Sequence, residues 1–280
     1  MIAGSALAGI GVALLWGFTS VLESLVAPKN RALVLVAWDA IWGILIVGLL
    51  SLLGVQWWDV SAEVWFWTIG GGTFRIVAWV VYWKIMSDKT SSLALAISAT
   101  YSLPTVLMMA ALGQPLQWMV LAATLTIFLG VLWSGARQKL SGNNLWWALL
   151  CCVLWGGWSV CQWKAAKITQ PQDLLAVSWI VNIVPSALIG LGLRLRGISL
   201  HISRRTAGTL LGAVSLGLLS TLLFYWGMKG GNAAQVVVLS SMYPLITLAV
   251  RVGMKKEVWS GRVAGGVAML VAGAAMASLA

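Results

Sequence analysis

The chain has 280 residues, of which 60% are hydrophobic and only 9% are charged. An ordinary soluble domain has about 25% charged residues, so this composition leaves too little polar surface to cover a water-soluble globule and predicts an integral membrane protein. Lys and Arg outnumber Asp and Glu by 18 to 7, but the cations lie in short connections and form no run that could follow a phosphate backbone, which argues against nucleic acid as a partner.

Ten apolar segments follow one another along the chain, each near the roughly 20 residues that a helix needs to cross about 30 Å of hydrocarbon. They span residues 2–27, 32–54, 64–86, 91–112, 117–135, 143–166, 174–193, 206–228, 232–251 and 258–279. Unpartnered backbone groups are costly in lipid, so each segment is predicted to be a helix. The fold class is therefore an all-α membrane protein with ten transmembrane helices.

Short motifs recur 139 to 143 residues later in the chain. They are Leu15-Trp16-Gly17 and Leu154-Trp155-Gly156, Tyr82-Trp83 and Tyr225-Trp226, and the stretches that hold Tyr101 with Pro104 and Tyr243 with Pro244. The chain thus divides into two copies of five helices, residues 1–140 and 141–280. Because five is odd, the second copy enters the membrane from the opposite side. Inverted repeats are typical of secondary transporters, whose substrate site lies near the midplane between the copies.

The distribution of basic residues predicts an orientation. Of the 18 Lys and Arg residues, 14 lie in the odd-numbered loops and their flanks, and only 3 lie in the even-numbered loops. The side richer in Lys and Arg faces the cytoplasm. We therefore expect a multi-pass protein of a bacterial plasma (inner) membrane with both termini outside.

The first helix of each copy carries a stripe of polar and aromatic residues. In the first copy it is Trp16, Thr19, Ser20 and Glu23, and in the second it is Trp155, Trp158, Ser159 and Gln162. Positions i, i+3, i+4 and i+7 share one helical face, and a polar face in a membrane helix points into the bundle. Such a stripe either lines a pocket or joins helices through hydrogen bonds and packing.

Three charged residues lie inside apolar segments. Arg75 is near the centre of the third segment, Asp39 is in the second and Glu23 is in the first. Charges at such depth usually face the bundle interior and pair with one another, which predicts an Arg75–Asp39 ion pair with either a functional or a structural role. The second copy has no matching charge, and its deepest polar residues are Gln162 and Asn182, so the predicted site is asymmetric.

Tryptophan and proline positions add to this prediction. Eight of the 19 tryptophans sit at segment ends, as an interfacial belt does: Trp57, Trp58, Trp65, Trp67, Trp118, Trp146, Trp147 and Trp259. Six lie deeper and predict an aromatic cage for a cation, an aromatic ring or a sugar face: Trp16, Trp38, Trp79, Trp155, Trp158 and Trp179. Pro104 and Pro244 lie within segments, where proline kinks a helix, and are predicted hinges.

These motifs resemble a known family. The Leu-Leu-Trp-Gly sequence that ends at Gly17 is similar to the opening of an EamA-type domain of the drug/metabolite transporter superfamily. So is the pattern of a fourth helix with a proline, a Gly-polar turn and a glycine-containing fifth helix, found here as Pro104, Gly113-Gln114 and Gly130, and as Pro244, Gly253 and Gly273. The usual Gly-Glu is replaced by Gly113-Gln114 and Gly253-Met254. The resemblance implies ten helices, transport of small metabolites and termini inside the cell, opposite to the charge prediction.

The sequence thus predicts a secondary transporter that moves a small polar metabolite by alternating access, with an amino acid or related zwitterion as the first candidate. Arg75 would meet a carboxylate, while Asp39 or Glu23 would meet an amine or carry a coupling proton. The predicted substrate-binding residues are Trp16, Glu23, Asp39, Arg75, Trp79, Tyr82, Tyr101, Trp155, Trp158, Gln162, Asn182, Tyr225 and Tyr243.

Other functions stay open. A sugar permease or a quaternary-ammonium or drug permease would use the same aromatic pocket. An intramembrane enzyme would need a nucleophile–base pair or metal ligands, and His201, the single histidine, lies outside the apolar segments. A membrane scaffold would need neither buried charges nor a repeat. We expect no cofactor and no metal, the lipid bilayer and a proton or counter-substrate as partners, and a monomer or homodimer.

Overall fold

The computed structural model describes residues 2–87, 97–135, 142–255 and 260–280, and in these ranges all regular secondary structure is helical. The α-helices are α1 (Ile2–Val26), α2 (Ala32–Leu52), α3 (Ala62–Ser87), α5 (Ser102–Ala111), α6 (Trp118–Gly135), α7 (Gly142–Ile168), α8 (Pro171–Leu195), α9 (Arg204–Gly230), α10 (Ala233–Ser240), α11 (Tyr243–Gly253) and α12 (Gly261–Ser278). Short 3-10 turns are η1 (Ala27–Lys29), η2 (Trp57–Asp59) and η3 (Ala99–Tyr101). The all-α prediction is confirmed.

The helices reproduce the ten predicted segments. Over the described ranges, eight helical stretches are long and apolar enough to cross a membrane, and two shorter apolar helices cover 99–111 and 118–133. Residues 91–96 and 258–259 of two predicted segments lie outside the described ranges. The seventh segment starts earlier than predicted, at Pro171, because a proline in the first turn of a helix gives up no intrahelical hydrogen bond.

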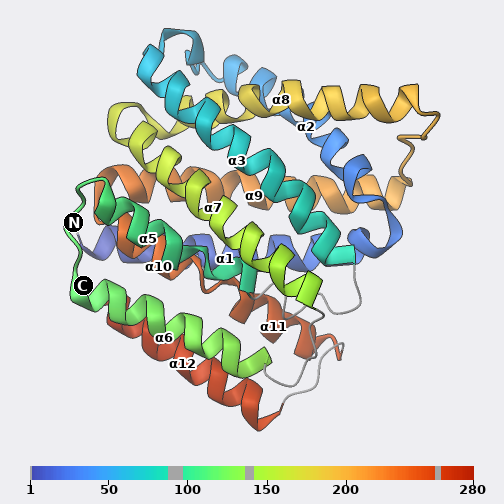
Figure 1. Ribbon diagram of the computed structural model, residues 1–280. Helices are drawn as coiled ribbons and strands as arrows, with labels where there is room; N and C mark the ends of the chain where they lie inside the picture. Colours follow the sequence, from blue (N-terminus) through green and yellow to red (C-terminus); the bar gives the residue numbers. More distant parts are fainter. Residues whose placement is uncertain (1, 88–96, 136–141, 256–259) are drawn as a thin grey trace.

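The two halves interlock as an inverted pair (Figure 1). Helix α1 packs along α9 and α7 packs along α3, so the first helix of each half lies against the third helix of the other. Helix α2 packs against its counterpart α8, and α6 packs against its counterpart α12. Exchanging the halves leaves this set of pairs unchanged, as an inverted repeat requires. The predicted boundary between residues 140 and 141 falls outside the described ranges.

The fourth and ninth segments are broken rather than kinked. Thr100, in η3, has φ −77° and ψ 18° and separates the preceding chain from α5. In the second half α10 ends at Ser240 and α11 begins at Tyr243. The sequence placed both bends at prolines, and this was wrong in detail. Pro104 and Pro244 lie in the first turn of the helix that follows each break, where proline is tolerated.

The two breaks meet inside the bundle. The hydroxyls of Tyr101, at the end of η3, and Ser240, at the end of α10, lie 2.6 Å apart and share a hydrogen bond. Both side chains are buried. The predicted approach of these two helices is confirmed, and it brings the two non-helical points of the backbone to one place between the halves.

Two glycines allow α3 to approach the second half closely. A Cβ atom on Gly72 would lie 2.3 Å from Val181 Cγ1 on α8, and one on Gly71 would lie 2.6 Å from Gln162 Nε2 on α7. A larger side chain at Gly72 would force the short, branched Val181 to move, whereas one at Gly71 would displace the end of the flexible Gln162 side chain. Arg75 follows within one turn, so these glycines help to set how deeply it enters the interface between the halves.

Candidate functional site

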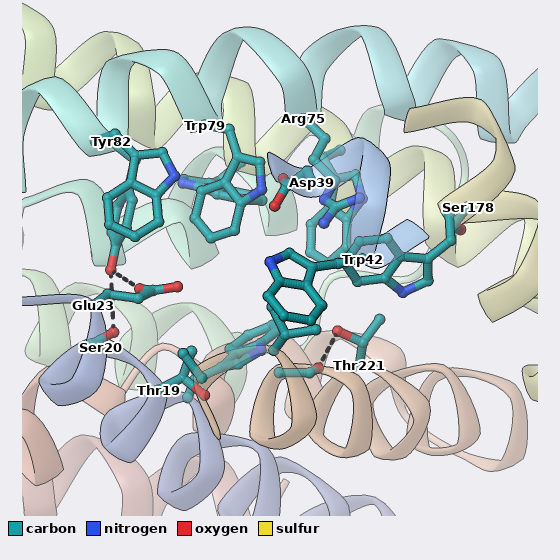
Figure 2. A pocket seen from close by; sticks show the side chains of 18 of the residues that line it. Thr19, Ser20, Glu23, Asp39, Trp42, Arg75, Trp79, Tyr82, Ser178 and Thr221 are labelled. Carbon is teal, nitrogen blue, oxygen red and sulfur yellow. Dashed lines mark hydrogen bonds between the residues drawn. The ribbon is translucent and has the colours of Figure 1, made fainter. Parts of the chain in front are cut away.

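A central cavity of about 140 Å³ lies between the two halves (Figure 2). Its wall comes from α1, α2 and α3 of the first half, from α7, α8 and α9 of the second, and from the two breaks through Tyr101 and Tyr243. In the wall so defined, α6 and α12 take no part. The first three helices of each copy and the two breaks therefore build the cavity.

Eleven of the thirteen predicted binding residues line this cavity. They are Trp16, Glu23, Asp39, Arg75, Trp79, Tyr82, Tyr101, Trp155, Trp158, Tyr225 and Tyr243. Gln162 and Asn182 do not: both are buried behind the wall, where Gln162 Oε1 accepts a hydrogen bond from Ser178 Oγ and Asn182 Nδ2 donates one to the Ser178 carbonyl. Their polarity correctly predicted that both side chains lie inside the bundle. It did not show whether they line the cavity or bond to neighbouring helices.

Arg75 lies among aromatic rings rather than on a carboxylate. Its guanidinium carbon is 4.8 Å from the ring centroid of Trp179 and 5.9 Å from that of Trp79. Asp39 is close enough to act on it electrostatically, but in the described structure the two form no ion pair within 4.0 Å. The ion pair predicted from the sequence is therefore not formed, and cation–π contacts hold the guanidinium in the wall instead.

Asp39 presents an unsatisfied carboxyl oxygen. Its side chain is 8% exposed, and its Oδ2 is buried without a hydrogen-bond partner. The indole Nε1 atoms of Trp42, Trp79 and Trp83, which belong to residues of the same wall, also lack partners. Buried polar groups are nearly always hydrogen-bonded, so this cluster can accept a donor at Asp39 and offer donors from the three indoles.

Glu23 is held differently. It is 5% exposed, and its Oε2 accepts a hydrogen bond of 2.5 Å from the Tyr82 hydroxyl, which also lies 3.4 Å from Ser20 Oγ (Figure 2). Glu23 thus lies two helical turns after Trp16 on α1 and is bonded to α3. The two acidic residues of the wall differ: the Glu23 carboxyl group accepts from Tyr82, whereas Asp39 interacts with Arg75 and Trp79 and leaves its Oδ2 without a hydrogen bond.

The second half contributes a neutral polar cluster. Ser178 Oγ donates to Gln162 Oε1 at 3.1 Å and lies 3.1 Å from the Tyr225 hydroxyl. The charged residues of the wall are Glu23, Asp39 and Arg75, all from the first half. The charge asymmetry predicted from the sequence therefore holds for the cavity wall.

Aromatic rings form much of the remaining wall. Trp16 lies at their centre, with ring centroids 6.3 Å from both Tyr101 and Tyr243 and 6.4 Å from Trp158. Five of the six tryptophans assigned to a cage line the cavity. The sixth assignment was wrong: Trp38 lies in a separate pocket, where its Nε1 donates to the Leu200 carbonyl at 3.0 Å.

Several residues of the wall were not predicted. They include Trp42, Trp83, Ser178 and Thr221. Ser178 follows Asp39 by the same 139 residues that separate Trp16 from Trp155, so the repeat spacing could have identified it. Across the described residues, His, Cys, Asp and Glu form no group of three or more that could hold a metal ion.

Comparison with known proteins agrees with this architecture. Residues 143–279 match the EamA-like transporter family. Chains of solved structures match as well, 28 in all. In one of them, described only as the crystal structure of a protein, 96% of the chain aligns with 98% of this one, at 23% sequence identity and a TM-score of 0.77. No curated protein matches. The structural likeness shows the fold alone, and the family match, which spans just under half of the chain, supports the family resemblance.

The family match covers the second half, α7 to α12, and the structural match covers almost the whole chain. The resemblance seen in the sequence is confirmed. The chain is a multi-pass membrane protein whose second half matches the EamA-like transporter family, and this match supports membership of the drug/metabolite transporter superfamily.

Proposed function

We propose that this transporter moves a small zwitterion of the amino-acid type across a bacterial plasma membrane by alternating access. The observation that carries the proposal is the presence of two opposite charges in one wall. Arg75 and the unpartnered oxygen of Asp39 face a single central cavity without forming an ion pair. A zwitterion supplies a partner for each of them.

The chemistry of the wall suits such a substrate. A guanidinium offers a planar fork that binds a carboxylate through two hydrogen bonds, and the unpartnered indole N–H groups of Trp42 and Trp79 add further donors. Asp39 accepts from the ammonium group, whose charge also interacts with the surrounding aromatic faces. The volume of about 140 Å³ is below the roughly 300–1,000 Å³ of pockets for drug-sized ligands, which favours a small metabolite.

The position of the cavity supports alternating access. It lies between two inverted halves, and Tyr101 and Tyr243 bring the two breaks into its wall. Broken helices at the substrate site of inverted-repeat transporters allow one half to rock against the other. In this proposal Pro104 and Pro244 keep each break in place, because neither can extend a helical hydrogen-bond ladder through its own nitrogen.

Counterflow into proteoliposomes tests the substrate class. Vesicles loaded with one unlabelled solute are placed in the same labelled solute, with amino acids, sugars and quaternary ammonium compounds tried in turn. We expect exchange of at least one amino acid and weak or no exchange of its amide or its decarboxylated amine. Exchange of sugars alone would contradict the proposal.

Asp39→Asn is the first variant to measure. It keeps the shape of the side chain but removes the charge, and a hydrogen bond to a charged group contributes about 1.5–3 kcal/mol. At 1.4 kcal/mol per tenfold change, we expect the KM of exchange to rise roughly ten- to a hundredfold. Asp59→Asn is the matched control, because Asp59 lies exposed in η2, outside the cavity wall. An unchanged KM in Asp39→Asn would remove Asp39 from substrate binding.

A sugar permease is the second candidate. The unpartnered indole N–H groups of Trp42, Trp79 and Trp83 would donate to hydroxyl oxygens, and the rings would stack on a sugar face. A sugar, however, leaves the charges of Arg75 and Asp39 without partners. A quaternary ammonium substrate would satisfy Asp39 but not Arg75, so Arg75→Lys separates the candidates: it should weaken exchange of a carboxylate substrate and spare the other two.

A further inference from the structure

Each half brings together polar residues at equivalent positions of its first three helices, with acidic residues in the first half and none in the second, and the hydrogen bonds within the two clusters differ. In the first half Glu23 on α1 is bonded to Tyr82 on α3, with Asp39 of α2 acting on it electrostatically. In the second half Gln162, Ser178 and Tyr225 come from α7, α8 and α9, the equivalent three helices, and are joined by hydrogen bonds. Gln162 follows Glu23 by 139 residues, the same spacing that separates Ser178 from Asp39.

The neutral copy shows what the structural role of this position requires. Gln162 is 1% exposed, and its amide satisfies the link between α7 and α8 without any charge. A glutamine at position 23 could accept from Tyr82 in the same way, through its amide oxygen. The carboxyl group of Glu23 is therefore not needed for helix packing. What it adds is the ability to gain and lose a proton.

The charges around the cavity leave a place for one proton. The wall contains two acidic residues, Glu23 and Asp39, and one basic residue, Arg75. A zwitterionic substrate adds no net charge, so binding it leaves one negative charge uncompensated at membrane depth, where charges are costly. A single proton on a carboxyl group of the wall removes the imbalance.

Glu23 is the better of the two carboxyls for this proton. Its titratable neighbours are Tyr82 on α3, Asp39 on α2 and Tyr243 on α11. The wall residues of α9 include no acidic or basic side chain, and they are Leu210, Ala213, Val214, Gly217, Thr221 and Tyr225. Arg75, by contrast, acts on Asp39. In the described residues around Glu23, no cluster of acidic, His or Cys side chains offers a metal cage instead.

We propose that Glu23 is the proton-carrying residue that couples transport to a pH gradient, and that Gln162 is its permanently neutral counterpart in the other half. This inference rests on the proposed transport function and adds the coupling ion to it. Glu23 is bonded to Tyr82 near the end of α3, whereas Gln162 lies beside Gly71, about three turns earlier on the same helix. The titratable residue and its neutral counterpart thus lie at different levels along α3.

The test exchanges Glu23 for the residue that its counterpart already has. Wild type and Glu23→Gln are reconstituted, and uptake of the amino acid identified by counterflow is measured with a pH gradient in each direction. One proton per substrate gives about tenfold accumulation for each pH unit. We expect wild type to accumulate substrate in one gradient direction, and Glu23→Gln to exchange substrate in counterflow but to reach only equal concentrations on both sides.

Glu63→Gln is the matched control. Glu63 is an exposed acid in the first turn of α3, outside the cavity wall, so this variant should accumulate substrate as wild type does. Gradient-driven accumulation that survives in Glu23→Gln would overturn the inference. Accumulation driven by a sodium gradient and not by a pH gradient would overturn it as well, while leaving the transport function standing.

A second readout needs no substrate and so separates this inference from the proposed function. Infrared difference spectra between acidic and alkaline pH report the carbonyl stretch of protonated carboxyl groups. We expect a band in wild type and Glu63→Gln that is missing in Glu23→Gln. A spectrum of Glu23→Gln identical to wild type would show that Glu23 does not titrate, even if no amino acid were transported.

Discussion

At the scale of single residues, the main feature of the site is that Arg75 and Asp39 form no ion pair with each other. Arg75 and Asp39 were predicted as partners because both are charged residues deep in neighbouring helices. The structure leaves them apart, with the guanidinium on Trp179 and an oxygen of Asp39 unsatisfied. Unsatisfied buried groups lower stability, and proteins often keep such costs at functional sites. The separation of the two charges therefore supports a role in binding more than a role in packing.

Trp179→Leu tests how Arg75 is held. Because the guanidinium carbon lies 4.8 Å from the Trp179 ring centroid, losing the ring removes a cation–π contact of up to about 2 kcal/mol. We expect the KM for the exchanged substrate to rise by up to roughly thirtyfold, since 1.4 kcal/mol is tenfold.

Trp118→Leu is the control for this variant, because Trp118 is 78% exposed at the start of α6 and lies outside the cavity wall. It should leave the KM unchanged. Equal KM values for Trp179→Leu and wild type would mean that Trp179 does not position Arg75.

Two neighbouring tryptophans show that helical spacing alone does not predict which side chains line the cavity. Trp38 and Trp42 lie one turn apart on α2, with ring centroids 6.1 Å apart. Trp42 lines the cavity, while Trp38 bonds to the chain between α8 and α9. Helical spacing places both on one side of the helix, but the partner of each is decided by packing between distant segments, which no local pattern encodes.

At the scale of elements, apolar length was sufficient to place the helices. A continuous apolar run has no other way to satisfy its backbone in lipid. Within the described residues, each predicted segment corresponds to helix, and the ninth is divided into α10 and α11. The breaks were misplaced because proline was their only local signal. Thr100 and Ser241, which mark the breaks, are not helix-breaking residue types. Their geometry depends on contacts such as the Tyr101–Ser240 hydrogen bond.

Gly72→Ala tests the close approach of α3 to α8. The added Cβ would lie 2.3 Å from Val181 Cγ1, and overpacking of this kind costs about 1–3 kcal/mol. We expect a lower thermal unfolding midpoint in detergent. Val181→Ala in the same chain should restore part of the loss, because it removes the atom that clashes.

Gly48→Ala is the matched control for this variant. Gly48 lies within α2 and has no atom within 4 Å of an added Cβ. Alanine is favoured over glycine in a helix by about 0.5–1 kcal/mol, so its midpoint should stay the same or rise. A midpoint for Gly72→Ala equal to that of Gly48→Ala would contradict the close packing.

At the scale of the whole molecule, the inverted repeat was readable because short motifs kept their spacing through both copies. The residues that line the cavity, however, could be predicted only in part from the repeat. Repetition predicts equal contributions from the halves, whereas Glu23 lines the cavity and its counterpart Gln162 lies behind the wall. The two halves therefore differ in charge at the cavity: all three charged residues of the wall come from the first half.

The orientation in the membrane gives the last prediction. Both chain ends lie on one side of the bundle, and the connection between α8 and α9 lies on the other (Figure 1). Basic residues are concentrated in the odd-numbered loops, to which this connection belongs. Since the side rich in Lys and Arg stays in the cytoplasm, we expect the termini to face outward, contrary to what family resemblance implies.

Cysteine labelling of His201→Cys and Leu279→Cys distinguishes the two orientations. Both positions are exposed, and the native Cys151, Cys152 and Cys161 are free and buried, so a membrane-impermeant maleimide should report the new cysteine alone. We expect Leu279→Cys to react in intact cells and His201→Cys only after permeabilisation. The reverse pattern would mean that the distribution of Lys and Arg does not set the orientation. Reaction of both in intact cells would contradict the fold itself, because the structure separates these positions by the full thickness of the bundle.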